Sequence, residues 1–179
     1  LRILWGKPGN QYFQALGTDP LLAAVRQLME LGVHVRGKYN AATAEIWDSA
    51  NDELWSRDKP LEIVTELIFP EEFQLTTSSQ AAMNTLQKWA FTVKAPKVRD
   101  ADQLASLFSS WTLPLSYWSG STLSDEGLQA LSTTMHTKLI DVKGTQVTEA
   151  GIRAFKQKHP LVRVVSDFGE FPPEYPKDD

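Results

Sequence analysis

The stretch that decides the fold is IDVKGTQVTEAGIRAF, residues 140–155. A second stretch, SYWSGSTLSDEGLQAL, begins 24 residues earlier at Ser116 and aligns with the first without gaps. The alignment pairs Gly120 with Gly144 and Leu123 with Val147. A fixed internal period of this length indicates stacked structural units, because one unit cannot bury its apolar face alone.

Each copy predicts a short strand, a turn and a helix. Ser124 and Thr148, each followed by an acidic residue, are expected to be the N-caps of the two helices. Gly127 and Gly151 are expected to allow close packing of the helix beside the strand. Alternate strand residues and the inner helix face should enter one core. The residues predicted to be buried together are Ile140, Val142, Val147, Ile152 and Phe155.

Weaker copies precede these two. Phe91 and Val93 take the strand positions of a third copy, and a fainter fourth copy surrounds Leu67 and Phe69. Helical spacing and caps predict helices at residues 18–31, 78–88, 100–108, 124–131 and 148–158. Apolar and β-branched runs predict strands at residues 1–5, 33–35, 61–69, 89–93, 113–118, 138–142 and 161–165. Residues 41–57 favour a helix with Ile46, Ala50 and Leu54 on one face, and a strand at 44–47 is the alternative.

The segment TQVTEAGI, residues 145–152, resembles the T-x-V-T-[DE]-x-G-[LI] stretch of 24-residue bacterial leucine-rich repeats. Residues 25–35 also resemble the helix-then-strand segment that often precedes such arrays. The resemblance covers roughly residues 61–165. It implies an α/β fold, a short stack with parallel strands on one face and helices on the other. The domains expected are an N-terminal βαβ-like capping segment at 1–60, the stack at 61–168, and an extended or disordered Pro-rich acidic tail at 169–179.

Composition excludes several classes of function. The chain has no cysteine, which rules out disulfides, thiolate zinc sites and cysteine nucleophiles. A net charge of -4 gives no basic footprint, so nucleic acid is not an expected partner. No apolar run approaches the ~18 residues of a membrane span. Localisation stays open, because a chain that begins at Leu1 is compatible with a removed leader or with a fragment.

Motifs for catalysis and metal binding are also missing. His34, His136 and His159 have no second ligand at metal-binding spacing, and neither a G-x-S-x-G elbow nor a phosphate loop occurs. We therefore expect no catalytic residue, no metal and no cofactor. The expected function is a non-catalytic protein-binding or scaffolding module. The alternatives are an open α/β ligand-binding domain or enzyme with its site at the carboxyl ends of the strands, and a structural subunit of a larger assembly.

The partner surface is expected on the outward strand positions, because strand side chains alternate between the two faces of a sheet. In the repeat register Trp118 points inward and Tyr117 outward. The row mixes an aromatic residue with polar and charged groups of both signs, which suits a protein partner. It consists of Thr92, Lys94, Tyr117, Ser119, Asp141 and Lys143.

Overall fold

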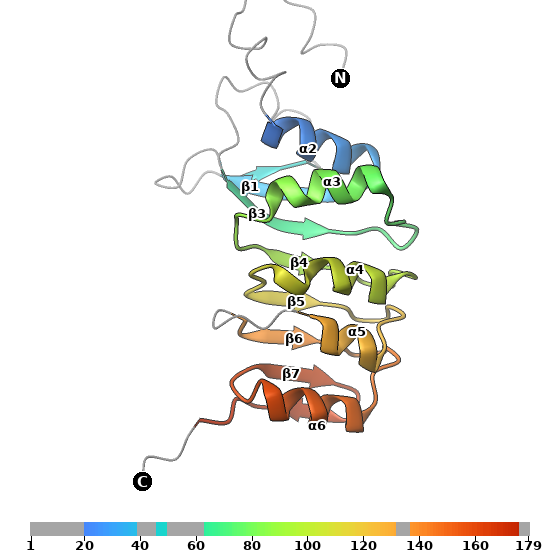
Figure 1. Ribbon diagram of the computed structural model, residues 1–179, viewed down its shortest axis with the longest axis vertical. Coiled ribbons are helices and arrows are strands. Elements are labelled where there is room, and N and C mark those ends of the chain that lie inside the picture. Colours follow the sequence, from blue (N-terminus) through green and yellow to red (C-terminus); the bar gives the residue numbers. More distant parts are fainter. Residues whose placement is uncertain (1–19, 39–45, 50–62, 132–136, 176–179) are drawn as a thin grey trace, which may run out of the picture.

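The computed structural model describes residues 20–38, 46–49, 63–131 and 137–175 (Figure 1). The strand expected at residues 1–5 and His136 lie outside these ranges. The same holds for the last four residues of the expected tail, 176–179.

The described strands form one mostly parallel sheet in the order β2-β1-β3-β4-β5-β6-β7-β8. Its middle strands, from β3 to β7, are parallel, and antiparallel pairs close both ends. The α/β class is therefore confirmed. The strands are β1 (His34–Lys38), β2 (Ile46–Asp48), β3 (Ile63–Ile68), β4 (Thr92–Lys94), β5 (Leu115–Tyr117), β6 (Leu139–Asp141), β7 (Arg163–Ser166) and β8 (Gly169–Phe171).

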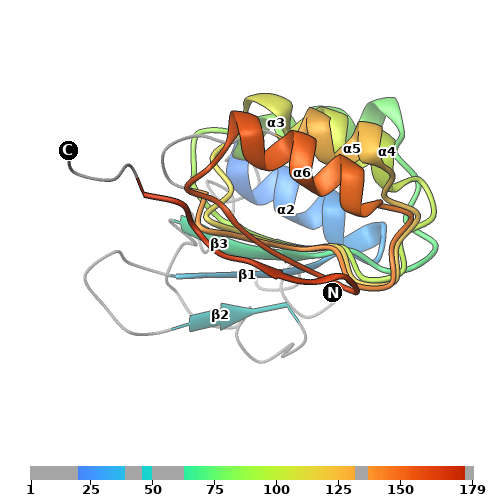
Figure 2. The same ribbon diagram turned by 90° about the horizontal axis from the view of Figure 1, so that it is seen from below.

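The described helices all cover one face of this sheet, as the view along the stack shows (Figure 2). From α3 onward the α-helices begin and end within two residues of the expected bounds. The helices are α2 (Pro20–Glu30), α3 (Thr77–Leu86), α4 (Ala101–Leu107), the 3-10 turn η2 (Phe108–Ser110), α5 (Asp125–Ala130) and α6 (Glu149–Lys158).

The strand register follows the predicted repeat. Ser116 lies opposite Ile140, which is the 24-residue pairing, and Ile140 lies opposite Val164. The five apolar residues predicted to share a core, from Ile140 to Phe155, are all buried. Asp141 is partly exposed and Lys143 is exposed. The predicted register of the last two copies is therefore confirmed.

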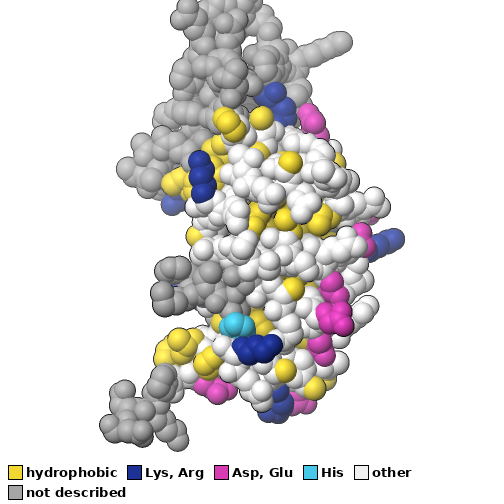
Figure 3. Space-filling model, viewed as in Figure 1, with side chains coloured by type: hydrophobic (Ala, Val, Ile, Leu, Met, Phe, Trp, Pro, Cys, Tyr) yellow, Lys and Arg dark blue, Asp and Glu magenta, His cyan; other side chains and the backbone are white. Residues whose placement is uncertain are grey.

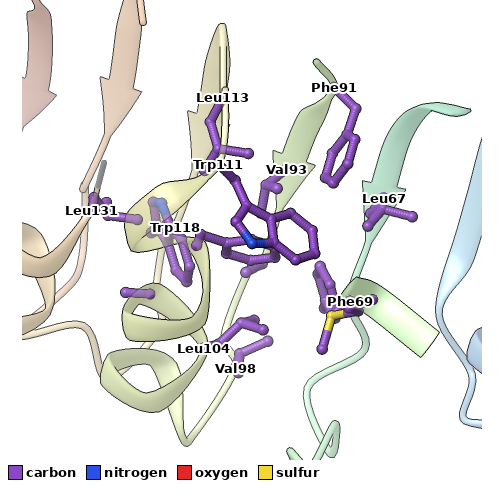
Figure 4. Close-up of a cluster of buried hydrophobic side chains, with 14 of the residues drawn as sticks. Leu67, Phe69, Phe91, Val93, Val98, Leu104, Trp111, Leu113, Trp118 and Leu131 are labelled. Atoms are coloured by element: carbon purple, nitrogen blue, oxygen red, sulfur yellow. The ribbon is translucent and has the colours of Figure 1, made fainter. Parts of the chain in front are cut away.

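Aromatic side chains fill the middle of the core (Figure 4). Phe108 packs edge-to-face against Trp111, with ring centroids 4.9 Å apart, and against Trp118 at 6.4 Å. Phe91 also packs edge-to-face against Trp111, with ring centroids 5.6 Å apart. Such pairs contribute about 0.5–1.5 kcal/mol each beyond the burial of their area. These rings join η2 to the segments just before β4 and just after β5.

The indole nitrogen of Trp118 is an exception in this core. Its Nε1 is buried and has no hydrogen-bond partner among the described residues. A buried donor without a partner costs about 1–3 kcal/mol. We expect Trp118→Phe to leave the free energy of unfolding within about 1 kcal/mol of wild type, because losing the orphaned donor offsets the lost packing. Chemical denaturation checks this, with Trp111→Phe as the control that should cost more.

Each of the last helices is capped by its own residue and held by the helix before it. Ser124 Oγ accepts hydrogen bonds from the N–H groups of Glu126 and Gly127, and Thr148 Oγ accepts from Gly151 N–H, so both expected N-caps are confirmed. The carboxylate of Asp125, in α5, accepts from Thr148 N and Thr148 Oγ, both at 2.7 Å.

The same arrangement occurs one unit earlier. Asp102, in α4, accepts from Ser124 N at 2.8 Å and from Ser124 Oγ at 2.6 Å. We call each such contact a carboxylate clamp, defined by Asp102 on Ser124 and by Asp125 on Thr148. The clamps join neighbouring helices through charge-assisted hydrogen bonds, which are about twice as strong as neutral ones.

The clamps explain two glycines and correct one expectation. A Cβ at Gly151 would lie 1.9 Å from Asp125 Oδ1, and one at Gly127 would lie 2.0 Å from Asp102 Oδ1. The closest approach is therefore to the carboxylate of the preceding helix. These glycines do allow close packing, as expected, but the group nearest to them belongs to the preceding helix and not to a strand. A side chain at either position would occupy the space of the clamp.

The helix favoured at residues 41–57 was also wrong where it can be checked. Residues 46–48 form β2, antiparallel to β1, with Arg36 opposite Asp48. Pairing with β1 supplies the backbone hydrogen bonds, and the side chain of Asp48 accepts from Arg36 Nε at 2.9 Å. Residues 41–45 and 50–57 lie outside the described ranges.

The segment expected to be a tail contributes to the sheet. Gly169–Phe171 forms β8, antiparallel to β7, after a tight turn in which Gly169 has a φ of +109°. Beyond it, the ammonium of Lys156 in α6 donates to the carbonyl oxygens of Pro160 (2.5 Å), Val162 (2.8 Å) and Pro172 (2.7 Å). Lys156 is 5% exposed. Residues 169–172 are thus fastened to the last helix.

The turns after the strands also change at this end. Gly120 N donates to the backbone oxygen of Lys143 in the next turn at 2.7 Å. Gly144 N, one unit later, donates instead to the side-chain carboxylate of Asp167 at 2.7 Å. In α6 the carboxylate of Glu149 accepts from Arg153 of its own helix, at 2.5 Å from Nη2. Side chains of the last unit thus take the bonding positions that a further unit would fill.

Candidate interaction surface

The helices leave one face of the sheet uncovered (Figure 2), and the burial pattern along the strands places the six predicted partner-binding residues on that side. Five of them, Thr92, Lys94, Tyr117, Ser119 and Asp141, are partly exposed, and Lys143 is exposed. The residues between them, Val93, Trp118 and Val142, are buried. The alternation therefore places all six on the outer side of the sheet or of the turns that follow it.

The six residues do not form a single row. Lys94 lies opposite Tyr117, and Tyr117 opposite Asp141, so these three are direct neighbours. Thr92 belongs to the adjacent row, where it lies opposite Glu66. Ser119 and Lys143 come after β5 and β6, in the turns at the carboxyl ends of these strands. The surface is accordingly two rows deep, with a margin of turn residues.

Apolar residues on this face were not predicted. Leu115 lies opposite Leu139, and both are partly exposed. Val165, opposite Asp141, is also partly exposed. Period-2 alternation could have found them, because Leu115 precedes Tyr117 by two residues and Leu139 precedes Asp141 by two. Leu115, Tyr117, Leu139 and Val165 are called the apolar strip below.

On one side of the apolar strip the charges are paired with one another. Arg36 donates from Nε to Asp48 and from Nη1 to Glu66, both at 2.9 Å. Lys94 Nζ lies 2.7 Å from the other Glu66 oxygen, and His34 Nε2 contacts Asp48. The hydrogen bond to Asp48 raises the pKa of Arg36 above its ordinary value. The positive and negative charges of this ion-pair cluster therefore balance one another.

On the other side, Arg163 Nη2 lies 2.7 Å from Glu170. Asp141, inside the strip, differs from these groups. Its carboxylate accepts from the backbone N–H of Lys143 at 3.0 Å, and no cationic side chain pairs with it in the described part of the chain. As far as the structure describes the chain, this face thus has an apolar centre that contains a carboxylate without a counter-ion.

The opposite face of the molecule has a different character. Hydrophobic side chains there are scattered among polar ones, and acidic side chains gather along the edge where the helices begin (Figure 3). Asp125 and Glu149, in the first turns of α5 and α6, are already bonded within the chain, Asp125 to Thr148 and Glu149 to Arg153.

A serine, a histidine and an aspartate do meet near β1. His34 and Ser49 line a shallow surface hollow together with Met29, Gly32 and Val33. Ser49 Oγ, however, accepts from Val35 N at 2.9 Å, while Asp48 contacts His34 Nε2. Within the described ranges, no hydrogen bond joins Ser49 Oγ to the imidazole, which is the contact that an activated serine requires.

The other histidine in the described ranges, His159, packs against Phe155 with ring centroids 4.8 Å apart. Burial lowers the pKa of His159, and the neighbouring charge of Lys158 lowers it further. Across the described residues, no three His, Asp or Glu side chains are grouped so that they could hold a metal ion. None of the described helices has the length and apolarity needed to cross a membrane.

Comparison with known proteins gave no relative. No protein-family model matches the chain, and neither a curated protein nor a solved structure matches it.

Proposed function

We propose that this chain is a non-catalytic protein-binding or scaffolding module that uses its strand face. In this proposal it is a short leucine-rich-repeat-like stack with an N-terminal cap. Two findings support the repeat architecture: the 24-residue pairing of Ser116 with Ile140, and the parallel strands with helices on one side. Stacks of this kind present an extended surface suited to a macromolecular partner.

The observation that carries the proposal is the apolar strip between two groups of paired charges. Leu115, Tyr117, Leu139 and Val165 are partly exposed on a sheet face that no described helix covers. An apolar centre with a polar rim is the usual anatomy of a protein interface. The six residues Thr92, Lys94, Tyr117, Ser119, Asp141 and Lys143 surround or belong to this centre, which makes them its proposed contact residues.

The double variant Tyr117→Ala, Lys143→Glu tests the surface. We expect it to keep its fold, because neither side chain is buried, and to lose its protein partner. Circular dichroism and the melting temperature check the fold. Quantitative pull-down with the intact chain as bait measures the partners.

The matched control is Gln157→Ala, Lys158→Glu, which makes the same types of change on exposed residues of α6. It should retain every partner that wild type captures. If the folded Tyr117→Ala, Lys143→Glu chain still captures them, the strand face is not the binding surface.

A further inference from the structure

The strand face also indicates what kind of partner segment it fits, an inference that rests on the proposed function. We infer that the partner presents apolar side chains together with one basic side chain, Lys or Arg, that pairs with Asp141. The argument rests on charge complementarity between the carboxylate of Asp141 and a cation of the partner. Each of the other charged groups in the two flanking clusters has an oppositely charged neighbour in this chain.

The first part of the argument is the pairing of those flanking charges. Glu66 is shared by Arg36 at 2.9 Å and Lys94 at 2.7 Å, and its side chain is 13% exposed. Arg163 and Glu170 satisfy each other at 2.7 Å. A strongly charged partner would have to compete with these pairs. The flanks therefore favour a partner that is mostly uncharged where it touches them.

The second part is the position of Asp141. It lies opposite Tyr117 on one side and Val165 on the other, and Leu139 precedes it by two residues on the same face. A partner that covers these apolar groups also removes water from the carboxylate. An ionised carboxylate that loses water without gaining a partner is costly, so the covering segment must bring a donor.

The third part is the geometry of the carboxylate. One oxygen of Asp141 accepts from Lys143 N–H and is fixed by it. The second oxygen has no hydrogen-bond partner among the residues that the structure describes. Lys143 is exposed in the following turn and makes no ion pair there within those same residues. A cation from the partner would therefore meet an acceptor that is already oriented.

Peptides are selected from a random display library for binding to the full chain. The affinity of synthetic copies of the selected peptides is then measured. We expect the selected peptides to be apolar and to carry at least one Lys or Arg. Asp141→Asn, which keeps an oxygen for the Lys143 N–H, should weaken their binding by roughly five- to thirtyfold. The control Glu126→Gln removes an exposed carboxylate on the helix face and should leave the affinity unchanged.

A charge exchange identifies the pair. A peptide with its basic residue replaced by Glu should bind poorly to wild type and regain affinity for Asp141→Lys. If the affinity of the peptides requires Tyr117 but changes equally with Asp141→Asn and Glu126→Gln, the inference is overturned. The proposed function would still stand in that case. Peptides indifferent to Tyr117→Ala and Leu139→Ala would overturn both, because they would bind away from the strand face.

Discussion

Replacing Gly151 with alanine should lower the free energy of unfolding by about 2–4 kcal/mol. The added Cβ would lie 1.9 Å from Asp125 Oδ1 and 2.2 Å from Asp125 Cγ, so the whole carboxylate must move. That movement breaks the hydrogen bonds from Thr148 N and Thr148 Oγ, both 2.7 Å long. Chemical denaturation followed by circular dichroism measures the loss.

A double-mutant cycle separates this cause from a general effect of the substitution. In the Asp125→Ala background the obstacle is gone, and Gly151→Ala should be neutral or stabilise by up to about 1 kcal/mol, because alanine favours helix over glycine. Equal destabilisation of the two backgrounds would show that the carboxylate clamp does not constrain position 151.

Replacing Lys156 with methionine should cost about 2–4 kcal/mol, a fall in melting temperature of roughly 5–15 °C. Methionine keeps an apolar stem but supplies no donor. The carbonyl oxygens of Val162 and Pro172 then lose the ammonium that lies 2.8 and 2.7 Å away. Pro160 O keeps one bond, from Glu174 N. Thermal unfolding measures the overall effect, and hydrogen exchange in β7 and β8 should report the local one.

Lys158 provides the matched control for this prediction. It lies in the last turn of the same helix and is exposed, with a long 3.3 Å contact to Gln129. Lys158→Met should change the stability by less than about 0.5 kcal/mol. If Lys156→Met unfolds at the same temperature as Lys158→Met, the buried ammonium does not hold the end of the chain.

The last two units could be predicted from the sequence because local and long-range signals agree there. Ser124 and Thr148 cap helices wherever a helix follows, and the same spacing that aligns them places Ser116 opposite Ile140. Strand alternation then assigned Tyr117 and Asp141 to the outer face. Each step needed only residues close in sequence and one constant offset.

The features that were missed depend on contacts between distant residues. From the sequence, Asp125 is a favourable negative charge in the first turn of its own helix. Its hydrogen bond to Thr148 exists only because the two helices are stacked. The three residues of β2 have acidic neighbours that suit a helix, yet pairing with β1 decides their conformation. Leu115 and Leu139 each lie one residue before the aligned copies, which start at Ser116 and Ile140, so the 24-residue alignment does not include them.

The bonds made by Asp167 and Glu149 have a consequence for assembly. Open sheet edges can pair with strands of other chains, and head-to-tail contacts that do not close into a ring give filaments. Here the turn donor of Gly144 is occupied by Asp167, the helix carboxylate of Glu149 is occupied by Arg153, and the chain reverses into β8. A second copy stacked on this end would find the Gly144 N–H and the Glu149 carboxylate already bonded, so it could not repeat the contacts that join neighbouring units within the chain.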